Sequence, residues 1–109
     1  MSGYYELKRS GDQYMFNLKA GNHEVILTSE RYTTRAAAQN GIESVRKNAT
    51  QDERYQRKTA SDGRFYFVLT ATNGQVIGVS QMYHAAPSRN GGIESVKANG
   101  PTDIVKEED

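Results

Sequence analysis

Residues 40–48 read NGIESVRKN, and residues 91–99 read GGIESVKAN. A phrase written twice at a spacing of 51 residues indicates an internal repeat. When residues 4–52 are set on residues 55–103 without a gap, 17 of the 49 pairs are identical. Composition alone would give roughly three identical pairs. The sequence therefore predicts a tandem duplication, with no linker-like stretch between the copies.

Each copy begins with three segments that have the pattern of strands. The middle segments, 14–20 (YMFNLKA) and 65–71 (FYFVLTA), alternate aromatic or branched residues with others, which is typical of half-buried strands. Asn73-Gly74 predicts a type I′ hairpin turn with positive φ at both residues, and Asn22-His23 is a weaker form of it. The flanking strands are expected at 4–9 and 24–30 in the first copy, and at 54–59 and 75–81 in the second.

A helical pattern follows the three strands in both copies. Thr33 or Thr34 can cap a helix over 35–48, in which Ala38, Ile42 and Val45 form one apolar stripe. The second helix is expected to be shorter and less stable. Pro87 fits only its first turn, Gly91 and Gly92 lie inside it, and Arg89 replaces the first alanine of the stripe.

The repeated phrase is interpreted mainly as structure. Glycine inside a helix costs about 1 kcal/mol relative to alanine, so Gly41 and Gly92 predict a close approach, here between the two helices. Glu43 points outward, with Lys47 four residues on as a surface partner. The alternative is a site that faces a ligand. The motif residues are Gly41, Ile42, Glu43, Ser44, Val45, Gly92, Ile93, Glu94, Ser95 and Val96.

Length and composition predict one soluble domain over residues 1–109. The chain has no cysteine, which fits a reducing compartment, and its first residues show neither a signal peptide nor a membrane span. We therefore expect a cytoplasmic protein that does not enter a membrane. The net charge is +1, and the tail 103–109 carries −3, which leaves +4 on residues 1–102. The acidic tail is expected to be a solvated end.

The meander, the Asn-Gly turn and the twice-written NGIESV-type phrase resemble the YegP-like proteins, a family of small bacterial and archaeal domains without assigned function. The resemblance covers almost the whole chain. It implies an α+β fold of two tandem β-β-β-α-β repeats that share one antiparallel sheet and exchange their last strands. Two helices would lie on one face, and a pseudo-two-fold would make the chain its own pseudo-dimer and hence a monomer. The stretch 84–87, Arg89 and the pair Gly91-Gly92 depart from the family pattern.

No catalytic, metal or cofactor site is predicted. His23 and His84 have no carboxylates or further histidines at ligand spacing. The serines lie in no G-x-S-x-G elbow, and the stretch 90–92 lacks the spacing of a phosphate-binding loop. A binding module for an unknown protein or small ligand is the leading class. A small enzyme with a site at the repeat junction has no residue set to support it.

The sheet face away from the helices offers the alternative function. If Phe16, Leu18, Phe67 and Leu69 face the helices, the other face presents an aromatic residue among cations, an arrangement that can stack single-stranded nucleic acid. A charge of +4 on residues 1–102 is low for such a partner. The predicted open-face residues are Met15, Asn17, Lys19, Arg57, Arg64 and Tyr66.

Overall fold

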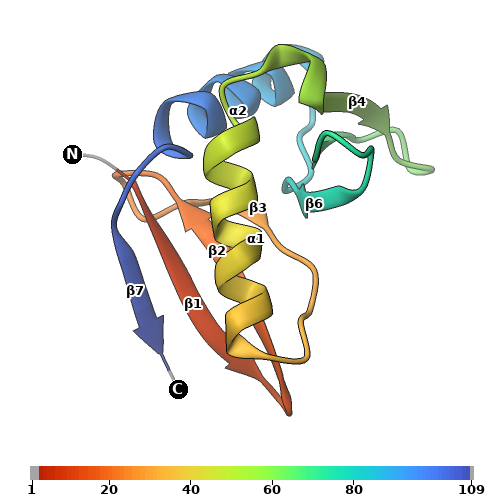
Figure 1. Ribbon diagram of the computed structural model, residues 1–109. Coiled ribbons are helices and arrows are strands. Elements are labelled where there is room, and N and C mark those ends of the chain that lie inside the picture. The colour runs from red at the N-terminus through yellow and green to blue at the C-terminus, as the bar shows by residue number, and fades with distance from the viewer. Residues whose placement is uncertain (1–2, 109) are drawn as a thin grey trace.

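The computed structural model describes residues 3–108 (Figure 1). The described chain has two helices and a seven-stranded sheet, which is the predicted α+β class. The elements are β1 (Tyr4–Ser10), β2 (Gln13–Lys19), β3 (Val25–Thr28), α1 (Arg35–Asn48), the 3₁₀ turn η1 (Asp52–Arg54), β4 (Tyr55–Thr59), β5 (Phe65–Thr70), β6 (Val76–Val79), α2 (Ala86–Asn99) and β7 (Val105–Glu108).

The sheet joins both repeats in the order β4-β5-β6-β3-β2-β1-β7. All neighbouring strands are antiparallel except β1 and β7, which run parallel with Tyr5 opposite Val105. Figure 1 shows β7, from the end of the chain, lying beside β1, from its beginning. The repeats meet where Thr28 of β3 pairs with Val79 of β6. These two residues are equivalent at the 51-residue spacing, and a two-fold axis between the repeats requires such a pairing.

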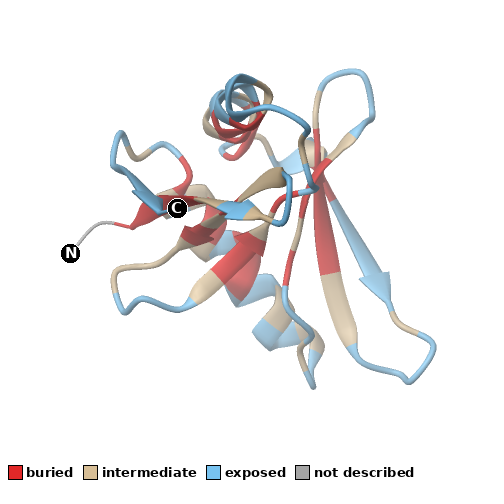
Figure 2. Cartoon of the chain, turned by 90° about the horizontal axis from the view of Figure 1, so that it is seen from below, coloured by how far each residue is buried: buried red, intermediate tan, exposed pale blue. Residues whose placement is uncertain are grey.

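Each helix packs on strands of both repeats, so the two copies share one core. Helix α1 contacts β2 as well as β5 and β6, and α2 contacts β5 as well as β2 and β3. The Thr34 hydroxyl accepts a hydrogen bond from Ala37 N at 3.0 Å, which confirms one of the two predicted caps. In Figure 2 the buried residues lie along the inner strands and on one side of the helices, while the turns and most of β4 and β7 are exposed. The fully buried large side chains are Tyr5, Phe16, Phe67, Leu7, Leu18, Leu27, Ile42, Leu69, Ile93, Val45 and Val96.

The first strands of the two repeats differ in register by one residue. Tyr5 lies opposite Leu18, whereas Tyr55 lies opposite Leu69, so the counterpart of Tyr55 is Tyr5 and not Tyr4. The contacts agree, because the hydroxyl of Tyr5 donates to Gly100 O at 2.6 Å and that of Tyr55 donates to Ala49 O at 2.5 Å. The gapless alignment is therefore wrong over the first strand.

The cause of this shift is the length of the first turn. In the first repeat, two residues separate the paired residues Ser10 and Gln13, and Gly11 takes a φ of 67°. In the second repeat, three residues follow Ala60, whose N–H donates to Arg64 O at 2.8 Å, and Gly63 takes a φ of 88°. One extra residue in the turn moves the whole strand by one position.

Two local predictions are wrong. The Asn-Gly turns are not type I′, because positive φ occurs at Gly74 and His23 but not at the asparagines. Each asparagine instead accepts a hydrogen bond from the N–H two residues on, in a three-residue loop followed by a register shift. Helix α2 is not shorter than α1, since both have 14 residues. Pro87 lies in its first turn, and the buried Ile93 and Val96 hold the rest on the sheet.

Candidate functional site

The buried members of the repeated phrase form part of the core. Gly41, Ile42 and Val45 are buried on α1, and Gly92, Ile93 and Val96 are buried on α2. A Cβ on Gly41 would stand 2.5 Å from the Tyr32 hydroxyl and 3.0 Å from Phe16 Cε2. Gly92 has the same relation to Tyr83 and Phe67. The close approach was predicted correctly, but its partner is a tyrosine before each helix rather than the other helix.

The polar members of the phrase have local partners. Asn48 Nδ2 donates to Ser44 O at 2.8 Å, and its Oδ1 accepts from Arg54 Nε at 3.2 Å. Asn99 repeats the bond to Ser95 O at 2.8 Å, and its Oδ1 accepts from Gly3 N at 2.9 Å. Asn99 thus ties the end of α2 to the backbone near the start of the chain, whereas Asn48 binds the side chain of Arg54, six residues further on. Glu43 and Glu94 are exposed.

The groups that most often perform catalysis have structural partners here. Ser29 Oγ accepts from Phe16 N at 2.9 Å and donates to Glu30 O at 2.7 Å, and Ser80 makes the same pair of bonds to Phe67 and Gln81. His23 Nδ1 lies 2.9 Å from the Tyr4 hydroxyl. Residues 3–108 contain no group of three or more histidine and acidic side chains that could hold a metal ion. No helix in that range is long and apolar enough to cross a membrane.

The open sheet face holds most of the residues predicted for it. Met15, Asn17 and Lys19 alternate with the helix-facing Phe16 and Leu18 and lie on this face. Tyr66 lies there on β5, half-buried, and Arg64 is exposed at the entrance to the same strand, where its Nε donates to Asp62 at 2.7 Å.

Arg57 was predicted on the open face and does not lie there. It pairs with Phe67, a helix-facing residue, and its Nε donates to Asn90 of α2 at 3.3 Å. The one-residue register shift explains this error. It makes Arg57 the counterpart of the buried Leu7, whereas the gapless alignment sets it on Glu6.

Two lysines of the open face, Lys8 and Lys19, are engaged with a buried carboxylate, while Lys58 lies opposite Tyr66 and Lys106 opposite Glu6 on the same face. Glu6 is only 8% exposed, and its oxygens lie 3.1 Å from Lys19 Nζ and 3.5 Å from Lys8 Nζ. Burial alone would raise the pKa of Glu6, but the hydrogen bond from Lys19 and the charge of Lys8 outweigh it and lower that pKa. The hydrogen bond to Glu6 raises the pKa of Lys19 in turn. Part of the positive charge on this face is therefore neutralised internally.

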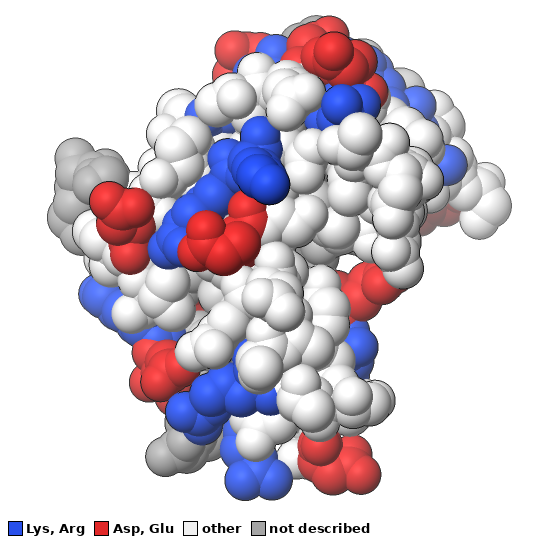
Figure 3. All heavy atoms as spheres, viewed as in Figure 1, with Lys and Arg blue, Asp and Glu red and all other residues white. Residues whose placement is uncertain are grey.

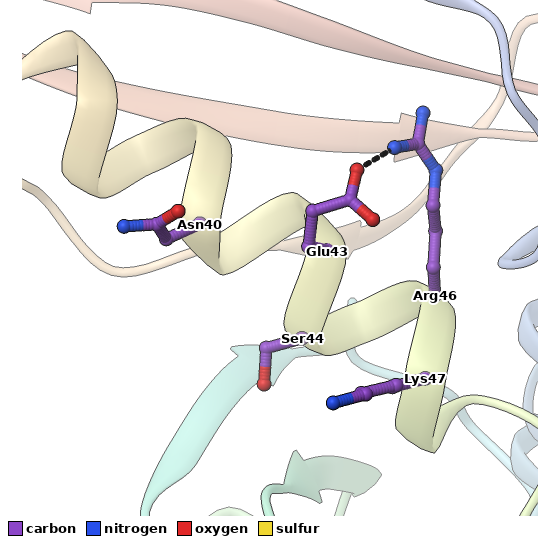
Figure 4. Close-up of a pocket in the computed structure, with 5 residues that line it drawn as sticks. All are labelled: Asn40, Glu43, Ser44, Arg46 and Lys47. Carbon is purple, nitrogen blue, oxygen red and sulfur yellow. Dashed lines mark hydrogen bonds and ion pairs between the residues drawn. The ribbon is translucent and has the colours of Figure 1, made fainter.

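Two adjoining hollows lie along α1, and sequence reasoning did not identify them as a site. The first, of about 560 Å³, lies along the exposed side of the helix. Figure 4 shows Glu43 and Arg46 pointing toward each other, with Ser44 and Lys47 on the other side of the helix. The second, of about 450 Å³, lies between α1 and β7. It is lined by Gln39, Asn40, Ile42, Glu43, Arg46, Val105 and Glu107, and is called the α1–β7 groove below.

Arg46 fixes one wall of the α1–β7 groove. Its Nε donates to Thr102 O at 2.7 Å, its guanidinium pairs with Glu43, and it lies 5.5 Å from the centre of the Tyr5 ring. Three contacts hold this cation in place and tie α1 to the segment that leads into β7. The other wall is held by Glu107 of β7, which pairs with Arg35 at 3.4 Å.

Among residues 3–108, the second repeat lacks the strand that would form the second wall of such a groove. Lys97 takes the place of Arg46 and pairs with Asp52 at 2.9 Å and with Glu94 at 3.4 Å. The hydrogen bond between Lys97 and Asp52 raises the pKa of the lysine and lowers that of the aspartate. Within residues 3–108 no strand lies outside β4, so the wall that β7 supplies is missing there. The second wall of the groove depends on the tail, which forms β7. Residues Val105–Glu108 are exposed, as expected of a solvated tail, and are in addition paired with β1.

Comparison with known proteins agrees with the repeat and the fold. The model of the family described as "Domain of unknown function (DUF1508)" matches residues 10–56 and again residues 60–107. UPF0339 protein YegP of Escherichia coli strain K12 is 58% identical over 108 residues, which cover 98% of each chain. The chain belongs to the YegP-like family. A UPF0339 protein of Bordetella pertussis is 64% identical over 108 residues, 99% of this chain and 97% of that protein.

Solved structures of the YegP-like family show the same fold. The solution NMR structure of YegP from E. coli, a protein of unknown function, superposes with a TM-score of 0.93 at 58% identity, covering 99% of this chain and 94% of that one. A UPF0339 protein from Shewanella oneidensis gives a TM-score of 0.92 at 51% identity, covering 98% and 92% of the two chains. The family brings no assigned activity to this chain, so function is argued below from the geometry of the chain itself.

Proposed function

We propose that the protein is a binding module without catalytic chemistry of its own, and that its ligand site is the α1–β7 groove. One observation carries the proposal. In this groove an apolar surface, formed by Ile42 and Val105, adjoins ionic groups that other contacts already hold in place. Sites for small molecules are typically concave and of a few hundred Å³, with a few placed polar groups. A hollow of about 450 Å³ falls in that range.

The lining residues suggest the class of ligand. Glu43 and Glu107 offer carboxylates, Arg46 offers a guanidinium, and Val105 offers an apolar surface that is 37% exposed. A small zwitterion with an apolar group, such as an apolar amino acid or dipeptide, would present an ammonium to the carboxylates and a carboxylate to the arginine. Charge-assisted hydrogen bonds of this kind fix orientation, and the apolar contact adds affinity.

The open face supports the nucleic-acid alternative less well. Lys8 and Lys19 are bound to Glu6, and Arg57 lies on the other face. Figure 3 shows the opposite face, which carries α1, and there lysine and arginine side chains lie beside acidic ones in small mixed clusters. Nucleic-acid binding draws on cations that are free to replace counterions at phosphates. We therefore keep single-strand binding as the second candidate; without Arg57, its predicted residues are Met15, Asn17, Lys19, Arg64 and Tyr66.

We also propose that the module works in the cytoplasm and as a monomer. The absence of cysteine fits a reducing compartment. The shared sheet and the two-sided packing of both helices support a chain that completes its own core.

The groove can be tested with a pair of neighbouring substitutions. Amide spectra of the ¹⁵N-labelled protein are recorded with a mixture of apolar amino acids and dipeptides. We expect shifts that cluster at Gln39, Glu43 and Val105. Val105→Arg fills the groove and should abolish them, while Ile104→Arg places the same side chain one residue away, at a position 45% exposed and outside the groove.

Thermal melts of both variants check that β7 stays paired with β1. Equal loss of binding in the two variants, with equal melting temperatures, would remove the groove from the proposal. Shifts that cluster instead at Lys19 and Tyr66 on adding short single-stranded RNA, and that weaken steeply with salt, would favour the second candidate.

A further inference from the structure

Strand β4 forms a free edge of the sheet. It pairs with β5 on one side and stands at the end of the strand order. Ala60 N donates to Arg64 O at 2.8 Å, so by alternation Lys58 and Gln56 direct their backbone groups toward β5. The backbone N–H and C=O of Arg57 and Thr59 then point outward. Free edges of this kind are where a further strand can add.

The corresponding edge of the first repeat already carries an added strand. Strand β1 is the counterpart of β4, as the matching contacts of Tyr5 and Tyr55 show. On β1 the added strand is β7, which runs parallel and begins with a hydrogen bond of 2.9 Å from Tyr5 N to Ile104 O. In the described chain, no strand fills the equivalent position beside β4.

The side chains indicate which kind of strand would fit. Strand β7 reads Val-Lys-Glu-Glu, and its acids lie by cations: Glu107 by Arg35 at 3.4 Å and Glu108 opposite Lys8. At the β4 edge Lys58 is the counterpart of Lys8, and the two positions before it change toward positive charge. Arg57 replaces Leu7, and Gln56 replaces Glu6. Thr59 replaces Arg9, so Tyr55–Thr59 carry a charge of +2 where residues 5–9 carry +1, and Arg57 shares its charge with Asp52 at 3.7 Å. The β4 edge is thus more basic by one charge than the edge that already binds an acidic strand.

We propose that β4 binds an extended acidic segment of a partner protein, which adds as a parallel strand in the register that β7 uses on β1. Main-chain hydrogen bonds to Arg57 and Thr59 would supply affinity, and the charges of Arg57 and Lys58 would select acidic sequences. The occupant is a partner rather than a second copy. The chain's own acidic strand is held on β1, and two copies of β4 would set like charges against each other.

The test uses the acidic strand of the chain itself as a probe. A synthetic peptide of residues 101–109, PTDIVKEED, is titrated into the intact ¹⁵N-labelled protein. We expect amide shifts at Tyr55–Thr59 that weaken with added salt. A peptide in which lysine replaces Glu107 and Glu108 should bind at least tenfold more weakly.

Two matched pairs of variants separate charge from backbone. Arg57→Glu should weaken binding at least tenfold, while Arg31→Glu reverses an exposed charge in the loop before α1 and should leave binding unchanged. Arg57→Ala removes the side chain but keeps the outward N–H, whereas Arg57→Pro removes both. We expect Arg57→Pro to bind the peptide more weakly than Arg57→Ala does. Melting temperatures check that both variants are folded.

Three results would overturn the proposal. Shifts centred on Tyr5–Lys8 would mean that the peptide displaces β7 from β1. Concentration-dependent dimerisation of the protein alone that Arg57→Glu abolishes would mean that a second copy occupies the β4 edge. No shift at millimolar peptide would mean that the edge does not accept acidic strands.

Discussion

The side chain of Leu27 occupies the space that a side chain at position 78 would need. A Cβ on Gly78 would stand 2.6 Å from Leu27 Cδ2 and 2.7 Å from its Cγ. The two residues are equivalent at the 51-residue spacing, and they are adjacent to Thr28 and Val79, which pair where the repeats meet. Because equivalent residues lie close together where the repeats meet, two large side chains would overlap there. This chain has a leucine at position 27 and a glycine at position 78, so only one side chain fills the space.

This relation predicts strong coupling between the two positions. Gly78→Ala should lower the free energy of unfolding by about 1–3 kcal/mol through overpacking. Leu27→Ala should lower it by about 2–5 kcal/mol, because Leu27 is fully buried. The double variant should lose less than the sum, since alanine at 27 vacates the space that alanine at 78 needs. A double-mutant cycle from denaturant melts measures the coupling, and losses that add within about 0.5 kcal/mol would contradict this account.

The neighbouring glycines of α2 should respond to alanine in opposite directions. A Cβ on Gly91 would have nothing within 4 Å, whereas one on Gly92 would stand 2.7 Å from Tyr83 Cζ and 3.2 Å from Phe67 Cε2. Gly91→Ala should therefore stabilise the protein by up to about 1 kcal/mol through helix propensity. Gly92→Ala should destabilise it by about 1–3 kcal/mol.

Gly41→Ala should behave as Gly92→Ala does, because Tyr32 and Phe16 repeat the same surroundings. Gly41→Val should lower the free energy of unfolding more than Gly41→Ala does. Glu43→Gln should change it by less than about 0.5 kcal/mol. Urea melts of these variants measure the differences. A Gly41→Ala protein more stable than the parent would show that Tyr32 moves aside freely, and would reopen the phrase as a site that faces a ligand.

Loss of the ion pairs of Glu6 should make the folded protein less stable in acid. Its folded-state pKa is lowered by Lys19 and Lys8, so the charged form is favoured in the folded protein. The stabilisation is present above the ordinary glutamate pKa of about 4.3 and is lost as the pH falls through the lower, folded value. Glu6→Gln should cost about 0.5–1.5 kcal/mol at pH 7, and much less at pH 3.

The control for Glu6 is Glu53→Gln, which removes an exposed carboxylate. Urea melts of both variants and the parent between pH 3 and 7 compare them. A Glu6→Gln effect that stays constant over this range would show that the ion pairs do not contribute to stability.

The sequence predicted the repeat, the strand order within each meander, the first helix and the buried stripe of Ile42 and Val45. These features can be read from local hydrophobic periodicity and from the identical residues that the two copies share. The position of Arg57 was missed because a single extra residue in the 61–63 turn reverses which face each residue of β4 presents. An alignment of the two repeats without gaps cannot show that one turn is a residue longer than the other.

The α1–β7 groove was missed for a different reason. Its two walls lie far apart in the sequence, and β7 is too short and too acidic to show the alternation of a buried strand. Its pairing with β1 depends on an edge that exists only in the folded sheet. The polar lining residues of α1, such as Gln39 and Arg46, look like any solvated helix face until Val105 is placed beside them.

The register shift itself predicts which tyrosines are equivalent. Tyr5→Phe and Tyr55→Phe should each cost about 1–3 kcal/mol, because each leaves a buried backbone carbonyl, of Gly100 or Ala49, without its donor. Tyr4→Phe loses only a half-buried contact to His23 and should cost less. Equal costs for Tyr4→Phe and Tyr55→Phe, with a small one for Tyr5→Phe, would support the gapless alignment instead.

The same two tyrosines predict a loss of stability in alkali. Burial raises the pKa of Tyr5 and of Tyr55, so the folded state holds both phenols in the protonated form. Their stabilisation is complete below the ordinary tyrosine pKa of about 10 and falls as the pH rises above it. Tyr5→Phe should therefore flatten the decline in the free energy of unfolding above pH 10, which urea melts at pH 9 to 11 can measure.

Neither repeat should fold alone. Strand β7, from the second repeat, pairs with β1 of the first, and Tyr5 reaches Gly100 just as Tyr55 reaches Ala49. A fragment of residues 1–52 would lack the strand beside β1 and the strands β5 and β6 on which α1 packs. A fragment of residues 53–109 would lack β2 and β3 beneath α2. We expect each fragment to be unstructured or self-associated by circular dichroism and sedimentation, and an equimolar mixture to regain the amide spectrum of the intact chain. A folded, monomeric half would show that the shared core is not required for folding.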